Sequence, residues 1–477
     1  MDTAEHSKLG QLPDEMFTII QAASNGFGPR LGRLALPGRK PIDTPHHLGI
    51  TSRGVVPHIT QDNFARSTSI SGVYVGLEDF IEKAPSQTPP LYKFKPPDAS
   101  SPLRRFIALP EQTLLVLGAR RSPPLAAPSA NPNTNETVAV STAVGFRTLR
   151  AEDYAEAVGG LGADIVVGLG DIPFGRALGS KRMEKATDRT IQWMQDHVTL
   201  RRHGDEHTVQ AKLFAPLLPV SCANQQFYID CLTQDLASDV SGLAVYDLAS
   251  LEDLPDSLAH LPRLGFAEPS SPHEILRHVA RGIDMLTIPF VIAATDAGIA
   301  LDFAFPTPAS MANTHGHDAP LPLGIDMWNI AHAADLSPLS KGCTCYTCTS
   351  HHRAYLQHLL AAKEMLGWVL LQIHNHHVID LFFAGVRRSI AEGVFEQEVE
   401  RFGQVYDSRL PEKTGQGPRI RGYQYKSEGP GEAKKNKSPF TMLDDGKEKL
   451  ADSTLPSADA DAGELEAKGF AEKEVQS

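Results

Sequence analysis

Short apolar runs that alternate with amphipathic stretches constrain the fold of this chain more than any other feature. The apolar runs have the length of buried strands, and they lie at 163–169, 212–220, 242–248 and 285–294. The amphipathic stretches at 180–198 and 271–285 have the spacing of helices. Strands that are apolar throughout are typical of a parallel sheet covered on both faces. The pattern predicts an α/β fold, and the length of 477 residues favours a closed (β/α)8 barrel over an open sheet.

The composition excludes several other classes of protein. The hydrophobic content of 41% is that of an ordinary globular chain, so collagen-like and wholly disordered chains are excluded. With 45 Lys and Arg against 57 Asp and Glu, the net charge of −12 argues against a strongly basic nucleic-acid binder. We expect a soluble intracellular protein, because the N-terminus shows no apolar signal region and the run at 286–294 is too short to span a bilayer.

Three of the five cysteines stand together, which is the pattern of a metal site. Cys343, Cys345 and Cys348, with His374 further along the chain, give the spacing C-x-C-x2-C-x25-H. Three thiolates and one imidazole match the tetrahedral preference of Zn²⁺ and leave no position for a substrate, so the site would be structural. The spacing alone leaves the choice of imidazole open, because other histidines follow the cysteines at 351, 352, 358, 376 and 377.

The cysteine cluster is flanked by short motifs. They are IDMWN (325–329) and DLSPL (335–339) before the cysteines, and HRAYLQHL (352–359), EMLG (364–367) and LLQIHN (370–375) after them. In this order and spacing the chain resembles the tRNA-guanine transglycosylase family, and weaker matches extend the resemblance over about residues 30 to 400. The resemblance implies a (β/α)8 TIM-like barrel with a zinc-binding subdomain, one structural Zn²⁺, and His374 as the imidazole ligand.

Composition and resemblance together predict five parts of the chain. They are a β-rich N-terminal part that leads into the barrel (1–112), a flexible Pro/Asn-rich loop (113–136), the main barrel (137–310), a zinc-binding subdomain with C-terminal helices (311–425), and a disordered acidic tail (426–477).

The resemblance implies an enzyme that exchanges guanine in tRNA, but the residues for this chemistry are missing. In that family a carboxylate attacks the ribose anomeric carbon, and a second carboxylate acts as acid and base. The attacking position lies two residues after the RGIDM motif (281–285) and falls on Thr287, whose hydroxyl is a poor nucleophile without an adjacent base. The Asp-Ser-Gly-Gly segment that supplies the second carboxylate has no counterpart in the sequence. We therefore expect no catalytic residue.

The base pocket of the family is altered as well. Its glycine-rich positions fall on Leu218–Val220 and on Tyr246, whose side chains would fill the space where a flat base approaches the backbone. The carboxylate that recognises the base falls on Gly170, although Asp171 lies next to it and could serve after a slip of one residue.

These losses make the chain resemble the non-catalytic half of the eukaryotic enzyme. The resemblance implies a heterodimer with a catalytic queuine tRNA-ribosyltransferase subunit. Together they would exchange guanine for queuine at wobble position 34 of tRNAs with GUN anticodons. Dimers of the family pack through the zinc subdomain. We expect a cytoplasmic protein without integral membrane association, and the resemblance adds the mitochondrial outer membrane as a peripheral location.

Two other functions stay open from the sequence. An active transglycosylase would need another nucleophile, either Asp284 or Asp302, and the segment DFAFPT (302–307) repeats the D-x-x-x-P-T pattern of the family. Using Asp302 requires about 15 inserted residues and moves the carboxylate off the strand end where barrel chemistry occurs. The second function is that of a zinc-stabilised scaffold with no role in tRNA modification.

Overall fold

The computed structural model describes residues 15–23, 27–84, 86–97, 100–127, 131–174, 179–203, 210–308 and 320–418. The acidic tail expected at 426–477 lies outside the described residues.

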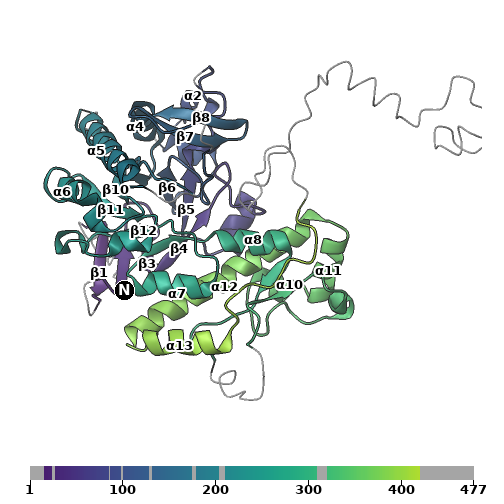
Figure 1. Ribbon diagram of the computed structural model, residues 1–477. Helices are drawn as coiled ribbons and strands as arrows, with labels where there is room; N and C mark the ends of the chain where they lie inside the picture. Colours follow the sequence, from purple (N-terminus) through teal and green to yellow (C-terminus); the bar gives the residue numbers. More distant parts are fainter. Residues whose placement is uncertain are drawn as a thin grey trace, which may run out of the picture. The chain divides into compact units, whose positions relative to one another are not determined.

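Eight parallel strands close into a barrel, as the sequence predicts (Figure 1). In chain order they are β4 (His46–Ile50), β5 (Gly72–Gly76), β6 (Leu114–Gly118), β9 (Ile165–Val167), β10 (Lys212–Leu217), β11 (Val240–Val245), β12 (Arg263–Gly265) and β13 (Met285–Thr287). The ring closes where β13 pairs with β4, with Met285 opposite His46 and Thr287 opposite Leu48. Five of these strands, β5, β6, β9, β12 and β13, are buried along their whole length, because the barrel interior fills one face and helices cover the other.

Helices and short antiparallel sheets surround the barrel. The helices before residue 300 are α1 (Gln61–Ser67), α2 (Pro90–Lys93), α3 (Pro102–Phe106), α4 (Ala151–Leu161), α5 (Ser180–Arg202), α6 (Gln226–Gln234), α7 (Pro272–Ala280) and α8 (Pro289–Ala297). The additional strands are β1 (Phe17–Gln21), β2 (Leu31–Leu34) and β3 (Ile42–Thr44) in one sheet, and β7 (Thr137–Thr142) with β8 (Gly145–Arg150) in a hairpin.

The structure corrects two expectations about where elements begin and end. The run at 285–294 was expected to be one strand, but β13 ends at Thr287 and α8 begins at Pro289. Proline suits the first turn of a helix, and α8 is apolar on nearly all sides because it lies between the barrel and a later helix. The segment 113–136 was expected to be a loop, but it begins with β6, a fully buried barrel strand. The barrel therefore starts well before residue 137.

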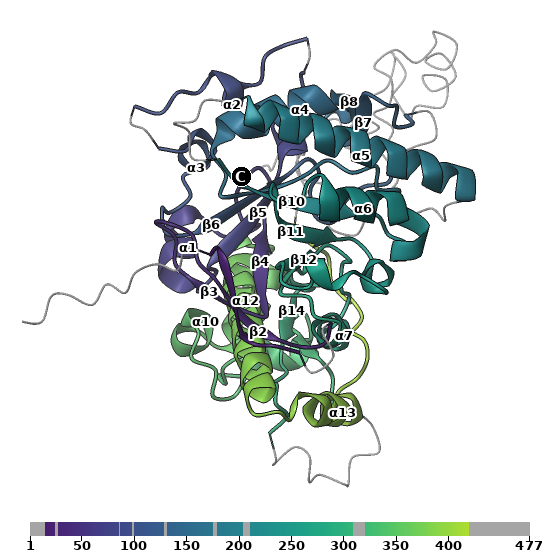
Figure 2. The ribbon, with the colours of Figure 1, turned by 90° about the vertical axis from the view of Figure 1, so that its left-hand side faces the viewer.

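The last third of the described chain forms a second layer against the barrel. It contains β14 (Ile299–Leu301), β15 (Gly324–Asp326), α10 (Tyr346–Ser350), α11 (Arg353–Ala361), α12 (Met365–Ala391) and α13 (Phe395–Val405). The long helix α12 contacts β2, β4 and α8, and Figure 2 shows it running past the N-terminal strands. The chain turns between α11 and α12, where Lys363 adopts a positive φ of 58°.

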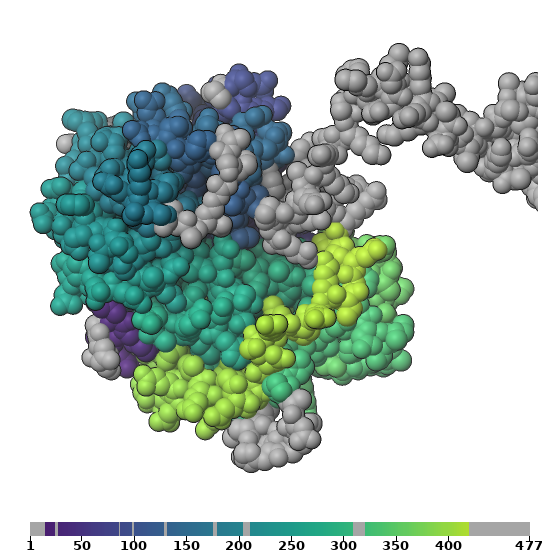
Figure 3. Space-filling model, viewed as in Figure 1, coloured from purple at the N-terminus to yellow at the C-terminus, as the bar shows by residue number. Residues whose placement is uncertain are grey.

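The chain end that the structure describes returns over this layer. This segment follows α13 and appears as a yellow-green band in Figure 3. Lys363 donates a hydrogen bond to Gln416 at 2.9 Å, and Gly415 lies against the ring of Trp328, where a Cβ atom would find no room. Among the helices of the described ranges, none has the length and apolar character needed to cross a membrane.

Candidate functional site

The three clustered cysteines lie around the start of α10, and His374 faces them from the middle of α12. Cys345 is the residue before α10, and its sulfur accepts a hydrogen bond from the backbone N–H of Cys348 at 3.3 Å. The Thr347 hydroxyl, between the two, donates to the carbonyl oxygen of Leu370 at 2.7 Å and so fixes α10 on α12. The loop that carries the cysteines and the helix that carries His374, which 25 residues separate in the sequence, are thus in contact.

The four side chains fit a tetrahedral metal ion. Nδ1 of His374 lies 3.7, 3.5 and 3.4 Å from the sulfur atoms of Cys343, Cys345 and Cys348. A zinc ion with Zn–S bonds of about 2.3 Å and a Zn–N bond of about 2.0–2.1 Å sets sulfur and nitrogen about 3.5–3.6 Å apart. The spacing of these donors therefore matches the edges of such a tetrahedron, and their chemistry is that of a closed structural site.

Surrounding hydrogen bonds fix the orientation of the histidine ring. Nε2 of His374 donates to the carbonyl oxygen of Leu301 at 2.9 Å, which leaves Nδ1 facing the sulfur atoms. The next residue, Asn375, accepts from the Leu301 N–H at 2.8 Å and donates to Thr295 and to the carbonyl of Ile299. The His-Asn pair therefore joins α12 to α8 and β14 while it aims the imidazole.

The pKa values in the cluster reflect how closely the four groups approach one another. Hydrogen bonds from Cys345 and Cys348 lower the pKa of Cys343, which favours its thiolate, the form that binds a metal. Burial by itself would lower the pKa of His374, but the hydrogen bonds with Cys343 and Cys348 raise it to about 9.

The position expected for the nucleophile is buried at the carboxyl end of β13. Thr287 is fully buried, and its hydroxyl accepts a hydrogen bond from Ser122 at 3.0 Å and donates to the carbonyl oxygen of Gly265 at 3.4 Å. Neither partner is a base that could activate an alcohol. The hydroxyl at this strand end is thus held inside the protein by two polar contacts.

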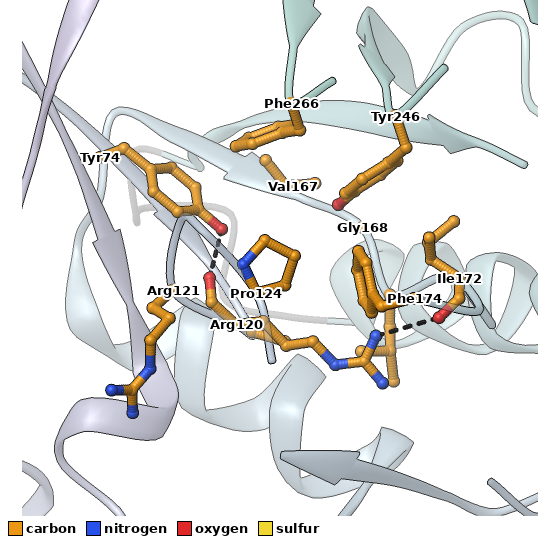
Figure 4. A pocket seen from close by; sticks show the side chains of 13 residues that line it. Tyr74, Arg120, Arg121, Pro124, Val167, Gly168, Ile172, Phe174, Tyr246 and Phe266 are labelled. Carbon is orange, nitrogen blue, oxygen red and sulfur yellow. Dashed lines mark hydrogen bonds between the residues drawn. The ribbon is translucent and has the colours of Figure 1, made fainter. Parts of the chain in front are cut away.

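Aromatic side chains fill the mouth of the barrel next to Thr287's end of the sheet (Figure 4). Tyr246 stacks on Phe266 with ring centroids 5.2 Å apart, and Tyr74 meets Phe266 edge-on at 4.9 Å. Leu218 packs with Phe174 and Tyr246 in one apolar cluster. The space that remains, about 30 Å³, has room for water but not for a purine base.

A partly buried arginine, Arg120, also lines this cavity, and the sequence analysis did not single it out. Its guanidinium lies 4.9 Å from the ring centroid of Phe174 and donates to the carbonyl oxygens of Ala139 and Ile172, a contact drawn in Figure 4. Burial lowers the pKa of Arg120. A single arginine after a strand carries no recognisable spacing, so only the folded barrel shows that its cation lies inside the mouth.

The carboxylate closest to the expected base-recognition position is already bound within the protein. Asp171 is fully buried and forms ion pairs with Arg182 at 2.6 Å and with Arg189 at 3.0 Å. Asn133 donates a further hydrogen bond to it at 2.6 Å. Burial would raise the pKa of Asp171, but these hydrogen bonds lower it. The one-residue slip that would let Asp171 read a base is therefore opposed by its own partners.

The two alternative nucleophiles lie away from the barrel mouth. Asp302 follows β14 in the second layer and accepts a hydrogen bond from Ser340 at 2.6 Å. Asp284 precedes β13, at the opposite end of the strand from Thr287, and forms a buried bidentate ion pair with Arg30 at 2.9 and 2.6 Å. Chemistry in such barrels occurs at the carboxyl ends of the strands, and neither carboxylate lies there.

The sequence analysis did not identify a further carboxyl group at the carboxyl end of the barrel strands. Glu268 lies in the loop after β12, in the left-handed region with φ of 50°. Burial raises its pKa to about 7. A Glu-Pro pair in a loop has no spacing that would signal this environment, so the sequence could not single it out.

Comparison with known proteins supports the resemblance stated above. The profile of the queuine tRNA-ribosyltransferase family matches residues 25–408. A relative from Schizosaccharomyces pombe, named queuine tRNA-ribosyltransferase accessory subunit 2, is 35% identical over 85% of this chain and 88% of its own length. Relatives with the same name from Drosophila mojavensis and Drosophila melanogaster are 28% and 27% identical, over 78% and 80% of this chain and 88% and 90% of their own lengths.

Proposed function

Because this chain belongs to the queuine tRNA-ribosyltransferase family, we propose that it is the non-catalytic subunit of a heteromeric enzyme. Its partner is a catalytic homologue of the same family, which exchanges guanine for queuine at wobble position 34 of tRNAs with GUN anticodons. This subunit supports that exchange and performs no bond-breaking step itself.

The observation that carries this proposal is the state of the barrel mouth. The strand end that would hold a nucleophile carries Thr287, buried and hydrogen-bonded to Ser122 and Gly265. The neighbouring cavity is occupied by Tyr246 and Phe266 and leaves no room for a base. An enzyme of this family needs both a free carboxylate and an open pocket, and this barrel offers neither at that position.

The thiolate cluster serves as a structural zinc site in this proposal. Cys343, Cys345, Cys348 and His374 hold one Zn²⁺, which ties the loop before α10 to α12. With four protein ligands the ion has no position for water or substrate, so it stabilises the fold and takes no part in the reaction. The sulfur-to-nitrogen distances of 3.4–3.7 Å support this assignment.

The same layer provides the surface for the catalytic partner. Large apolar side chains of this layer are exposed, and we call them together the apolar patch: Ile330, Leu336, Tyr346, Met365 and Leu366. Ile330 and Leu336 are 75% and 74% exposed. Contact between large apolar side chains and water is unfavourable, so we propose that the partner covers them. The patch supports a heterodimer that packs through the zinc-binding subdomain.

The location of the protein is proposed from the likeness to the family alone. We place the protein in the cytoplasm, with peripheral binding at the mitochondrial outer membrane.

The test is guanine exchange in tRNA, measured with queuine added. Three samples are compared: this chain alone, the catalytic homologue alone, and the mixture. Exchange only in the mixture supports the accessory role. Exchange by this chain alone would show an active enzyme and contradict the proposal. If the exchange rate of the catalytic homologue does not change when this chain is added, the proposal is also contradicted, and this chain would be a scaffold without a role in tRNA modification.

A further inference from the structure

A second group of metal-binding side chains lies at the N-terminal end of the barrel, where α12 packs on β4. His46 and His47 are the first two residues of β4, and Asp380 faces them from α12. Nε2 of His47 lies 2.8 Å from Oδ1 of Asp380. One nitrogen of each imidazole and one carboxylate oxygen all lie within 4.8 Å of one another. Side chains more than 330 positions apart in the sequence thus meet at one point.

The surroundings hold these side chains in place. The second oxygen of Asp380 accepts a hydrogen bond from the hydroxyl of Ser69 at 2.5 Å. The ring of His47 stacks between those of His376 and Phe383, each with its centroid 5.7 Å away. Carboxylates that bind metals are themselves fixed by hydrogen bonds, and an apolar surround limits the access of water. Both features are present around Asp380.

Part of the hydrogen-bonding capacity of this group is unused. Nδ1 of His46 is buried and has no hydrogen-bond partner among the described residues. Buried nitrogen atoms without a partner are rare, because leaving water costs free energy that nothing then offsets.

We propose that His46, His47 and Asp380 bind a second divalent metal ion, Zn²⁺, with one further position open to water. Two imidazoles and a carboxylate are a ligand set that suits Zn²⁺. His46 and Asp380 are only partly buried, so an ion can reach the site from solvent. The ion joins β4 to α12, the helix that also carries His374. This inference does not depend on the proposed accessory role.

The competing interpretation is a simple buried ion pair between His47 and Asp380. The protein contains such a pair elsewhere: Nε2 of His58 lies 2.6 Å from Oδ1 of Asp296, and no third metal-binding side chain joins them within the described ranges. The His58–Asp296 pair is therefore a matched control for the loss of one imidazole from a buried histidine–carboxylate contact.

The test is the metal content of the full-length protein after incubation with excess Zn²⁺ and dialysis. We expect two equivalents for the wild type, one for His46→Gln and Asp380→Asn, and two for the control His58→Gln. A wild type that retains one equivalent overturns the proposal. Retention of two equivalents by both His46→Gln and Asp380→Asn also overturns it, because the second ion would then be bound elsewhere.

Cobalt substitution separates loss of the site from loss of the fold. Co²⁺ in the thiolate cluster gives a sulfur-to-metal charge-transfer band, which folded variants keep. In the wild type, the second equivalent of Co²⁺ should add only the weak bands of nitrogen and oxygen ligands. If the second equivalent instead increases the sulfur band, His46, His47 and Asp380 are not its ligands, and this result needs no variant to fold.

Discussion

At the scale of single residues, the departures from the family's catalytic pattern are spread over several positions. Restoring a carboxylate at Thr287 alone would place it in a fully buried site beside Ser122, where an ionised group is strongly unfavourable. Tyr246 and Phe266 would still fill the cavity. A non-catalytic subunit under this account is therefore defined by the whole barrel mouth and not by one substitution.

Replacing Thr287 by alanine separates structure from catalysis. Thr287→Ala leaves the Ser122 hydroxyl without its acceptor, and we expect a loss of about 1 kcal/mol in the free energy of unfolding, measured in urea. Exchange by the complex with the catalytic homologue should stay within twofold of wild type, because the residue contacts no substrate. Thr287→Ser, which keeps the hydroxyl, is the control. A large fall in turnover with normal stability would show that Thr287 takes part in the reaction.

Glu268 should make the stability depend on pH. Burial raises its folded-state pKa from the ordinary 4.5 to about 7. Between these values the folded state holds the proton more tightly than the unfolded chain does, so stability falls as pH rises through this window. Glu268→Gln removes this dependence on pH. The gain in the free energy of unfolding of the variant over the wild type should therefore be larger at pH 8 than at pH 4, by roughly 1–2 kcal/mol, a figure discounted because Glu268 is partly exposed. An equal difference at both pH values would contradict the buried-carboxyl environment.

At the scale of elements, the predictable parts are those whose signals are local in sequence. The strands β9, β10 and β11 were recognised because each is a short apolar run between turns or helices. The run at 285–294 was misassigned because an apolar stretch without periodicity does not distinguish a strand from the buried helix α8. The strand β6 was hidden because a Pro/Asn-rich stretch follows it directly and shifted the expected boundary.

The candidate functional residues likewise divide into those with a local signal in the sequence and those that only tertiary contacts bring together. The thiolate cluster is visible in the sequence because three ligands lie within six residues of one another. Asp171 illustrates the opposite case, since its position was noted but its ion pairs with Arg182 and Arg189 exist only after α5 packs beside β9. His47 and Asp380 are brought together by tertiary contact alone, and no spacing could predict their meeting.

The link between α10 and α12 should depend on the metal. Cys345→Ser removes one ligand of the proposed zinc ion, and metal binding is coupled to folding free energy in such sites. We expect loss of zinc by elemental analysis and weakening of partner binding by at least tenfold. Cys231→Ser, which changes a buried cysteine outside the cluster, is the control and should retain zinc. Normal zinc content in Cys345→Ser would contradict the ligand assignment.

At the scale of the whole molecule, the proposal requires a surface that a second subunit covers. Leu336→Asp places a charge within the apolar patch without disturbing the core, because Leu336 is 74% exposed. Burying a leucine side chain contributes about 1.5–3 kcal/mol, so its loss should weaken the heterodimer roughly 10- to 100-fold in sedimentation experiments.

The matched control for the patch is Phe227→Asp, since Phe227 on α6 is also apolar and 82% exposed. It should leave the heterodimer intact. Equal weakening by Phe227→Asp and Leu336→Asp would mean that the apolar patch is not the contact surface.

We propose that this subunit never bonds to tRNA during exchange, and a denaturing gel can check this. In the family, the nucleophilic carboxylate displaces guanine from the ribose and leaves the tRNA covalently attached to the protein. The mixture of this chain, the catalytic homologue and labelled tRNA is trapped during turnover and separated on the gel. We expect label on the catalytic homologue and none on this chain. Label that migrates with this chain, and disappears in Asp302→Asn, would contradict it.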